Sequence, residues 1–310
     1  MAGRAYRAGG APGGGPGARA MAATLCLVLP GVLLRGLCGA HPCAAEKGRR
    51  MTHEHPPAVS IVMPAYNAGR FIGAAIDSVL AQTCQDWELI VVDDASTDGT
   101  AGLVRAYQQR DARIRHERQP RNQGVAAARN RALEMARGRY VAFLDSDDTW
   151  EPAKLARQLA FMEQSGAAIS YAAYLRVDDD GRELSRVRVP AVVRYADMLT
   201  SNHIGNLTGI FRRAELADLR FEPVRHEDYL FWLHAIERVG EARATPSDEP
   251  LARYRASAGS LSGNKLRAAG WQWRIYRQTL GLSVARSAWL FACYAVNALR
   301  KRCAWCGMFQ

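Results

Sequence analysis

Short apolar runs alternate with amphipathic segments between residues 59 and 145, and this alternation is the strongest constraint on the fold. The apolar runs predict strands at 59–66, 87–94, 113–118 and 139–145. Segments with apolar residues at every third or fourth position predict helices at 70–82, 98–110 and 124–136. Strands that alternate with helices in this way are typical of an α/β fold, in which helices cover both faces of a parallel sheet.

Polar side chains follow three of these strands, at the end where the ligands of a parallel sheet bind. Tyr66 follows the first strand, and Asp94 ends the second. The fourth strand leads into three carboxylates, which belong to Asp145, Asp147 and Asp148. Because Asp145 and Asp147 alternate along the chain, both can point at one Mg²⁺ or Mn²⁺ ion, which prefers oxygen ligands. The alternative is that the acidic cluster forms a solvated turn or caps a helix.

The sequence after residue 150 predicts further elements without the same regular alternation. Helices are predicted at 152–164 and 226–240, and strands at 167–177 and 186–193. These elements extend an α/β domain, but their order in a sheet does not follow from their pattern.

Two helices are predicted at the C-terminus, at 271–282 and 283–302. They combine Trp and Tyr with Arg and Lys around a charge-free run from 287 to 299. A bilayer span takes about 20 residues, so this run is too short to cross a membrane but suits a helix in the membrane interface. The alternative is that both helices pack on the domain.

The first 50 residues differ in composition from the rest of the chain. They contain seven Lys and Arg against one Glu, and so supply +6 of the formal net charge of +11. The apolar run 21–34 has the length of a signal-peptide core. The alternative, which we favour, is that translation begins at Met51. We therefore expect residues 1–57 to be a disordered, leader-like or mis-annotated extension.

The net charge of residues 51–310 argues against a nucleic-acid-binding protein, and the cysteines argue against a disulfide scaffold. The other 260 residues carry a net charge of only +5, whereas a duplex-binding protein needs a dense basic stripe, so we expect no nucleic-acid partner. Seven cysteines lie scattered without a disulfide framework, which favours a reducing compartment and a cytoplasmic location. Cys303 and Cys306 form a CxxC, but no second pair or His cluster completes a zinc site.

Four blocks of sequence, in order, resemble the family 2 glycosyltransferases of the GT-A fold. They read VSIVMPAYNAGRFIGAAIDSVLAQT, WELIVVDDASTDGT, NQGVAAARNRALEMARGRYVAFLDSDDTW and HEDYLFWL. The resemblance implies a Rossmann-like nucleotide-diphospho-sugar transferase domain at 58–262, with a mixed, mainly parallel sheet flanked by helices. Residues 263–310 would form C-terminal amphipathic helices. LARYRASAGSLSGNK and WQWRIYR further resemble bacterial enzymes that build capsular polysaccharide, lipopolysaccharide or teichuronic acid chains.

The resemblance implies a donor site at the ends of the first two strands. Pro64, Ala65 and Tyr66 would line the nucleotide base, and Tyr66 would stack on it. Asp94 would accept hydrogen bonds from the base, or else cap the turn that follows it. Arg129 would face the donor phosphates from the start of a helix, or else support the fold.

The resemblance also assigns the acidic residues to metal binding and catalysis. Asp147 matches the principal ligand of Mg²⁺ or Mn²⁺, and Asp145 would contact ribose or the metal. Asp228 matches the base that deprotonates the acceptor hydroxyl. Glu227 would orient this base or the acceptor, and Arg255 would contact the diphosphate or the acceptor. The alternative for Glu227 and Asp228 is the ordinary preference of a helix's first turn for acidic residues.

These roles predict an inverting, metal-dependent glycosyltransferase that uses a nucleotide sugar, with a UDP-sugar as the expected donor. The acceptor would be lipid-linked or a growing cell-surface polysaccharide, and the protein would lie peripherally at the inner face of the cytoplasmic membrane. The Gln-x-x-Arg-Trp element of processive members is absent from the sequence, which indicates addition of one or a few sugars.

Two alternatives to this enzyme remain at the level of sequence. One is a membrane-surface protein that binds a nucleotide sugar without catalysis. The other is a nucleotidyltransferase, which would need a Gly-rich triphosphate loop followed by basic residues. Residues 63–70 offer only Gly69 and Arg70 for such a loop.

Overall fold

The computed structural model describes residues 55–247, 249–256 and 265–305. All of these residues belong to one compact unit that spans Thr52–Gln310. The predicted extension before residue 55 and the predicted boundary between residues 262 and 263 lie outside the described residues.

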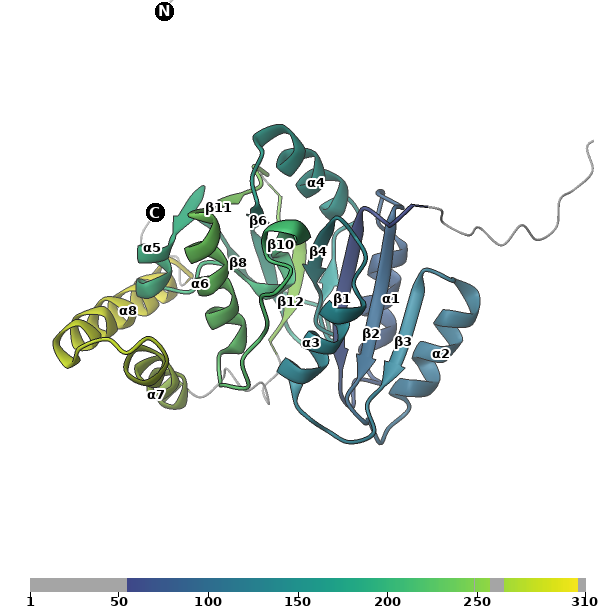
Figure 1. Cartoon of the computed structure of the whole chain (residues 1–310), viewed down its shortest axis with the longest axis horizontal. Helices are drawn as coiled ribbons and strands as arrows, with labels where there is room; N and C mark the ends of the chain where they lie inside the picture. Colours follow the sequence, from purple (N-terminus) through teal and green to yellow (C-terminus); the bar gives the residue numbers. More distant parts are fainter. Residues whose placement is uncertain (1–54, 248, 257–264, 306–310) are drawn as a thin grey trace, which may run out of the picture. The chain divides into compact units, whose positions relative to one another are not determined.

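An eight-stranded sheet forms the centre of this unit (Figure 1). Its strands, in spatial order, are β3 (Ile114–Arg118), β2 (Trp87–Asp93), β1 (Val59–Ala65), β4 (Tyr140–Phe143), β10 (Ile210–Arg212), β6 (Ile169–Tyr171), β11 (Glu241–Ala244) and β9 (Val192–Arg194). The first four strands are mutually parallel, and β10 runs antiparallel to both of its neighbours. The predicted parallel sheet is therefore confirmed for the first half of the domain, and the whole sheet is mixed.

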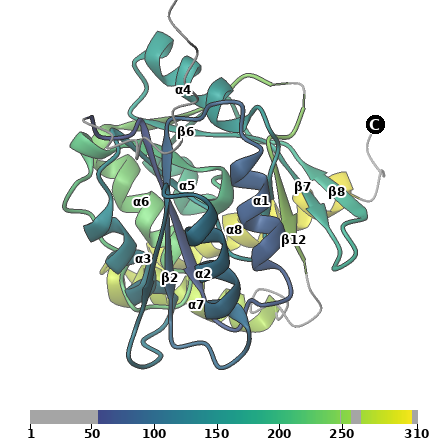
Figure 2. The ribbon, with the colours of Figure 1, turned by 90° about the vertical axis from the view of Figure 1, so that its right-hand side faces the viewer.

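Helices cover both faces of this sheet, as predicted. They are α1 (Ile72–Leu80), α2 (Thr100–Arg110), α3 (Val125–Met135), α4 (Lys154–Ser165), α5 (Tyr195–Thr200) and α6 (Glu227–Val239), with the 3-10 turns η1 (Asn206–Thr208) and η2 (Arg213–Glu215). Ile61 and Met63 of β1 pack with α1 and α4, whereas Val62 between them packs with α3 and α6. This alternation follows from the pleat of a strand. Figure 2 shows α3 and α6 on one side of β2 and α1 on the other.

A second, four-stranded sheet has the order β5 (Thr149–Trp150), β12 (Ala252–Arg255), β7 (Tyr174–Val177) and β8 (Glu183–Val187). The prediction of a single strand at 167–177 was wrong, because this stretch divides into β6 of the large sheet and β7 of the small one. The strand predicted at 186–193 likewise divides between β8 and β9. An apolar pattern records burial but not the partner strand, so it could not locate these breaks.

Two helices follow at the C-terminus, α7 (Lys265–Arg274) and α8 (Val284–Trp305), with a π-helical turn (Ile275–Thr279) between them. Tyr276 and Leu290 join the core cluster that contains α6. The side chain of Asn297 donates a hydrogen bond of 3.2 Å to the carbonyl of Thr200 at the end of α5. The helices therefore pack on the domain. Among the described residues, no helix has the length and apolar character that crossing a membrane requires.

Candidate functional site

The carboxyl ends of β1, β2 and β4 meet at one edge of the sheet, where the predicted residues follow them. Ala65 lies opposite Asp93 in the register of β1 and β2, and the amide of Leu144 after β4 donates to the carbonyl of Val62, at 3.0 Å. The chain then turns sharply, because the amide of Asp148 donates to the carbonyl of Asp145 at 3.1 Å. These backbone contacts place the acidic loop next to the ends of the central strands.

Arg129 of α3 joins two acidic segments that lie far apart in the sequence. Its Nη2 donates to Oδ1 of Asp145 at 2.7 Å, and its Nη1 donates to Oε1 of Glu227 at 2.9 Å. The guanidinium is buried, and Phe221 lies against it with 5.1 Å between Cζ and the ring centroid. Burial disfavours the charged guanidinium, but Asp145 and Glu227 outweigh this effect and raise the pKa of Arg129.

The predicted contact of Arg129 with donor phosphates stays a prediction. Both terminal nitrogens of the guanidinium bind carboxylates inside the protein, an arrangement that fits the alternative role of Arg129 in supporting the fold. It brings the loop after β4 and the start of α6 to one place.

Arg255 of β12 holds the acidic loop from the other side. Its backbone amide donates to Oδ1 of Asp148 at 2.8 Å, and its Nε donates to the carbonyl of Asp147 at 3.0 Å. Its Nη1 donates to the carbonyls of Asp178 and Asp179 in the turn between β7 and β8. Arg255 thus connects two loops, and its predicted contact with the diphosphate or the acceptor stays a prediction.

The three carboxylates of the loop have different surroundings. Asp145 pairs with Arg129, whereas Asp148 is buried and burial together with Asp147 raises the pKa of its carboxyl well above the ordinary value. Asp147 is exposed, yet the surrounding protein and then Asp145 raise its pKa to about 6, an effect that its contact with solvent screens in part. When all three carboxyls are ionised, the loop therefore carries more negative charge than its ion pair with Arg129, the one present among the described residues, neutralises.

This excess of charge fits a divalent cation. The described residues contain no group of three or more His, Cys, Asp or Glu side chains arranged around a metal position. Mg²⁺ commonly takes one or two carboxylates from the protein and its other oxygen ligands from a bound phosphate and from water. Asp147, exposed and repelled by its neighbours, is the carboxylate best placed for that role, and Asp145 is the second.

Glu227 and Asp228 begin α6. His226 precedes them in a left-handed conformation, with φ of 64°, which turns the chain into the helix. Burial and Asp228 raise the pKa of Glu227 more than Arg129 lowers it. Asp228 is partly buried and has no hydrogen-bond or ion-pair partner within the part of the chain that the structure describes. Of the two carboxylates, Glu227 is thus held in place by its ion pair with Arg129, and the role of Asp228 as a base stays a prediction.

Of the three residues predicted to line the base, only Tyr66, which follows β1, presents its side chain to solvent. Tyr66 is 52% exposed and available for stacking, whereas Pro64 and Ala65 are buried. Any contact of Pro64 and Ala65 with a base would therefore come from their backbone, and this contact stays a prediction.

Asp94 has a structural role that the sequence suggested only in outline. Its Oδ1 and Oδ2 accept hydrogen bonds from the amides of Gln123 and Gly124, each at 2.8 Å. It thus anchors the loop before α3, whereas the turn after β2 is capped by Asp93, which accepts from the amide of Ser96 at 2.9 Å. Contact of the buried Asp94 with a base stays a prediction.

Two groups of site residues were not predicted from the sequence. Phe71 lies between two guanidiniums, those of Arg70 and Arg255, whose Cζ atoms are 4.7 and 4.5 Å from its ring centroid. Trp271 of α7 contacts His226 edge to face, with 5.2 Å between the ring centroids. The WQWR sequence was the available signal for the second contact, because it combines aromatic and basic residues near the C-terminus.

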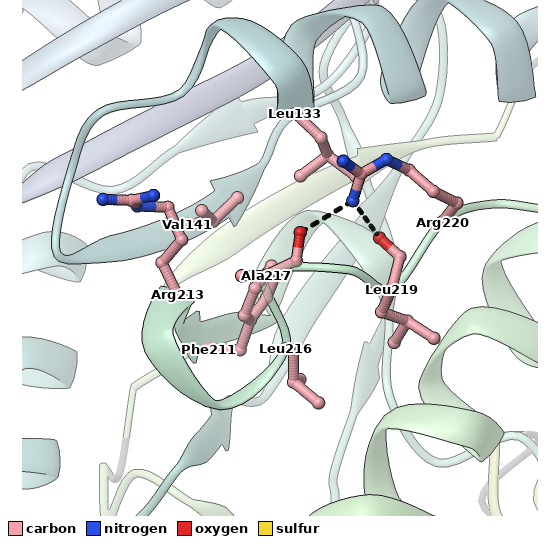
Figure 3. A pocket seen from close by; sticks show the side chains of 8 residues that line it. All are labelled: Leu133, Val141, Phe211, Arg213, Leu216, Ala217, Leu219 and Arg220. Atoms are coloured by element: carbon pink, nitrogen blue, oxygen red, sulfur yellow. Dashed lines mark hydrogen bonds between the residues drawn. The ribbon is translucent and has the colours of Figure 1, made fainter.

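A small pocket lies elsewhere, between α3, β4, β10 and residues 213–220 (Figure 3). Six of its eight lining residues are apolar, and Arg220, which also lines it, donates to the carbonyls of Ala217 and Leu219. None of the predicted site residues lines this pocket. The acidic residues that Arg129 brings together therefore remain the candidate site.

Comparison with known proteins gives one family and several relatives. The model of Glycosyl transferase family 2 matches residues 60–220. The putative teichuronic acid biosynthesis glycosyltransferase TuaG of Bacillus subtilis is 40% identical over 248 residues, which cover 79% of this chain and 98% of TuaG. The UDP-Glc:alpha-D-GlcNAc-diphosphoundecaprenol beta-1,3-glucosyltransferase WfgD of Escherichia coli is 35% identical over 243 residues, covering 78% and 94% of the two chains.

Solved structures share the fold at lower identity. The crystal structure of S. aureus TarS 1-349 in complex with UDP-GlcNAc has a TM-score of 0.56 and 22% identity, covering 79% of this chain and 72% of that chain. The mannosyltransferase PcManGT from Pyrobaculum calidifontis, in complex with GDP-Man and Mn²⁺, has a TM-score of 0.55 and 18% identity, covering 78% and 74%.

Proposed function

Because the chain belongs to glycosyl transferase family 2 and has the GT-A fold of a glycosyltransferase, we propose that it transfers a sugar from a UDP-sugar to a lipid-linked acceptor. WfgD, which is 35% identical, is named for a UDP-Glc donor and a diphosphoundecaprenol-linked acceptor. TuaG is named for teichuronic acid biosynthesis. The product would accordingly be a cell-surface polysaccharide or its lipid-linked precursor, made at the inner face of the cytoplasmic membrane.

The observation that carries this proposal is the pairing of Arg129 with both Asp145 and Glu227. One buried guanidinium holds the acidic loop after β4 beside the acidic start of α6. A transfer reaction needs these two chemical functions next to each other, because the donor diphosphate leaves from one side of the anomeric carbon while the acceptor attacks from the other.

On the donor side, Asp147 and Asp145 would hold Mg²⁺ or Mn²⁺ with the diphosphate oxygens. When bound, the cation supplies positive charge for the departing nucleoside diphosphate. Arg255 fixes the loop by binding the carbonyl of Asp147, so that the carboxylates keep one position. Tyr66 offers an exposed ring for stacking on the base.

On the acceptor side, Asp228 would accept the proton of the attacking hydroxyl. The new bond forms between that oxygen and the anomeric carbon, while the bond to the diphosphate oxygen breaks. A single displacement of this kind inverts the configuration at the anomeric carbon. Glu227, fixed by Arg129, would orient the acceptor or the base.

The test is release of the nucleoside diphosphate from a panel of UDP- and GDP-sugars, with a lipid-diphosphate-linked GlcNAc acceptor and either Mn²⁺ or EDTA. We expect transfer with a UDP-sugar that stops in EDTA and resumes with added Mn²⁺. Asp147→Asn should raise the Mn²⁺ concentration needed for half-maximal rate by about tenfold or more.

The matched control is Asp180→Asn, which removes an acidic residue of the exposed turn between β7 and β8 that pairs with Arg182. This variant should keep the metal dependence of the unaltered chain. Binding of a nucleotide sugar without any release would instead indicate the non-catalytic alternative. Release of pyrophosphate from a nucleoside triphosphate would indicate a nucleotidyltransferase.

A further inference from the structure

Helix α8 has one buried face and one exposed apolar face. On the buried face, Leu290 joins the core, and Phe291 contacts Trp273 of α7 edge to face with 5.8 Å between the ring centroids. The opposite face exposes six apolar residues, which we call the outer face of α8: Ala285, Ala288, Trp289, Ala292, Val296 and Leu299.

These six residues form one continuous stripe. Steps of three and four positions from Ala285 through Trp289, Ala292 and Val296 to Leu299 keep side chains on the same side of a helix. Of the nine large hydrophobic residues that are exposed among the described residues, four lie on α8, and Trp289 and Leu299 are 64% and 59% exposed. Single exposed apolar residues need no explanation, but a concentration of them on one helix face does.

The charge around this face selects the partner. From residue 265 to the end, the sequence contains eight Lys and Arg and no Asp or Glu. Arg286 is exposed near the start of α8, and Arg300, Lys301 and Arg302 follow the charge-free run in the sequence. Two copies of this segment facing each other would bring like charges together, whereas a surface of anionic lipid would attract them.

We propose that the outer face of α8 docks on an anionic bilayer surface, with Trp289 and Val296 in the interface and the exposed Arg286 at the level of the lipid phosphates. An amphipathic helix with an aromatic and aliphatic face, edged by Arg and Lys, binds membranes in this orientation without crossing them.

Docking through α8 also fixes the orientation of the candidate active site. α7 contacts the start of α6 through Trp271 and His226, and the hydroxyl of Tyr276, which follows α7, donates to the carbonyl of Leu199 in α5. α8 is thus joined, through α7, to the helix α6 that carries Glu227 and Asp228. This second step rests on the proposed function, since it matters only if the acceptor is held in the bilayer.

The docking experiment uses the full chain and vesicles without donor or acceptor. Vesicles of phosphatidylcholine alone are compared with vesicles that contain phosphatidylglycerol, by flotation at low salt and in 0.5 M NaCl (about a 4 Å Debye length). We expect flotation with the anionic vesicles that weakens in high salt. Trp289→Glu should weaken binding by about tenfold or more. The control Leu103→Glu changes an exposed apolar residue of α2 and should bind like the unaltered chain.

A second measurement reports on Trp289 directly. Lipids with brominated acyl chains quench tryptophan fluorescence at short range, and residues 1–54 contain no tryptophan, so the N-terminal segment cannot give this signal. The quenching lost in Trp289→Phe should account for most of the quenching in the unaltered chain. Equal quenching of the two proteins, or equal flotation of Trp289→Glu and the unaltered chain, would overturn the proposal.

Light scattering tests whether a second copy of the chain, rather than a membrane, covers the outer face of α8. Conversion of a dimer into a monomer by Trp289→Glu would show that a second copy covers the outer face, and would also overturn the proposal. An unchanged mass together with lost flotation supports it.

Transfer assays then separate docking from the proposed function. Trp289→Glu should lose activity at least tenfold on an acceptor held in anionic vesicles and keep its activity on a short-chain, water-soluble acceptor. Loss on both acceptors would place the outer face in the catalytic machinery and overturn a docking role. If the unaltered chain uses neither acceptor, the proposed function fails while the flotation result stands by itself.

Discussion

The two acidic segments that meet at Arg129 differ in the surroundings of their clustered carboxylates. In the loop after β4, three carboxylates lie within four positions, and among the described residues only Asp145 has an ion-pair partner. Asp147 is left exposed with a raised pKa. At the start of α6 there are two carboxylates, and the helix amino terminus itself favours negative charge.

The difference separates a binding role from a reacting role. The loop after β4 keeps an excess of negative charge, which a dication with its diphosphate would neutralise. The start of α6 has one carboxylate fixed by Arg129 and one without a partner among the described residues. The first arrangement suits a ligand that arrives with its own charge, and the second suits a proton acceptor.

The sharpest test of this division is Asp228→Asn. The amide keeps the size of the side chain but cannot serve as a base, so kcat should fall by about 10²- to 10⁴-fold. The Mn²⁺ concentration for half-maximal rate should not change, because the two segments have different tasks. Steady-state kinetics over a range of Mn²⁺ concentrations measures both quantities. Asp218→Asn, in an exposed pair with Arg238, is the control. A shift in metal requirement with little change in kcat would contradict the division.

The link between the two segments can be broken with Arg129→Met. This change leaves Asp145 and Glu227 partly buried without their common partner, so the free energy of unfolding should fall by about 3–5 kcal/mol. Urea unfolding gives this value. Arg131→Met is the matched control on the same helix, because it removes exposed pairs with Glu117 and Glu134 and should cost about 0–1 kcal/mol. Equal losses in the two variants would mean that the link has no special importance.

The support of the acidic loop can be weakened separately with Arg255→Ala. The variant loses side-chain hydrogen bonds to three backbone carbonyls and should be less stable by about 1–3 kcal/mol. Because Arg255 holds the loop after β4, the KM for the donor should rise while the KM for the acceptor stays the same. The control is Arg253→Ala. Arg253 lies on the same strand as Arg255 and pairs with Glu151, and its loss should leave both KM values unchanged.

The smallest expected effect comes from replacing Lys154. This basic residue lies close to the acidic loop in the sequence, but its side chain packs on Trp150 instead. Its amine is buried over the ring of Trp150, 3.9 Å from the ring centroid, and has no hydrogen-bond partner within the described part of the chain. Burial lowers its pKa well below the ordinary value. Lys154→Met should therefore stabilise the protein by about 1–2 kcal/mol at pH 7.

The dependence of this effect on pH has a definite sign. In the unfolded chain Lys154 is protonated up to about pH 10.4, whereas burial makes the folded amine release its proton at a lower pH, so the unfolded state binds the extra proton between the two pKa values. The unaltered chain gains stability as the pH rises, and the advantage of Lys154→Met should shrink between pH 7 and 10. Urea unfolding of both proteins over this range measures the difference. A destabilised Lys154→Met variant would show that the amine does act as a counter-charge of the loop.

The first half of the fold followed from the sequence because its strands are buried on both faces. Such strands appear as continuous apolar runs between helices, as in β1 and β2, and their connections through helices force a parallel order. The second half lacks this pattern. The Ala172–Ala173 break between β6 and β7 has no turn residue, so the two strands appeared as one.

The sequence predicted individual residues of the candidate site but not the ion pairs that join them. Asp145 and Asp147 could be selected because they follow a predicted strand, whereas Glu227 and Asp228 were selected through the resemblance to family 2 glycosyltransferases. The partner of Arg129 could not be selected, because no local pattern connects it with a residue 98 positions away. The contact of Pro64 and Ala65 with a base stays a prediction, and the burial of both residues in β1 leaves only their backbone for it.

The pairing of Arg129 also has a consequence for the order in which the protein folds. Asp145 lies 16 residues from Arg129, and Glu227 lies 98 residues away. The cost of closing a loop grows with its length, and the chain is synthesised from its amino terminus. The sheet from β3 to β4 can therefore form, with Arg129 and Asp145 already together, before the residues of α6 leave the ribosome. Arrival of Glu227 completes the site, so we expect the two acidic segments to come together late in folding.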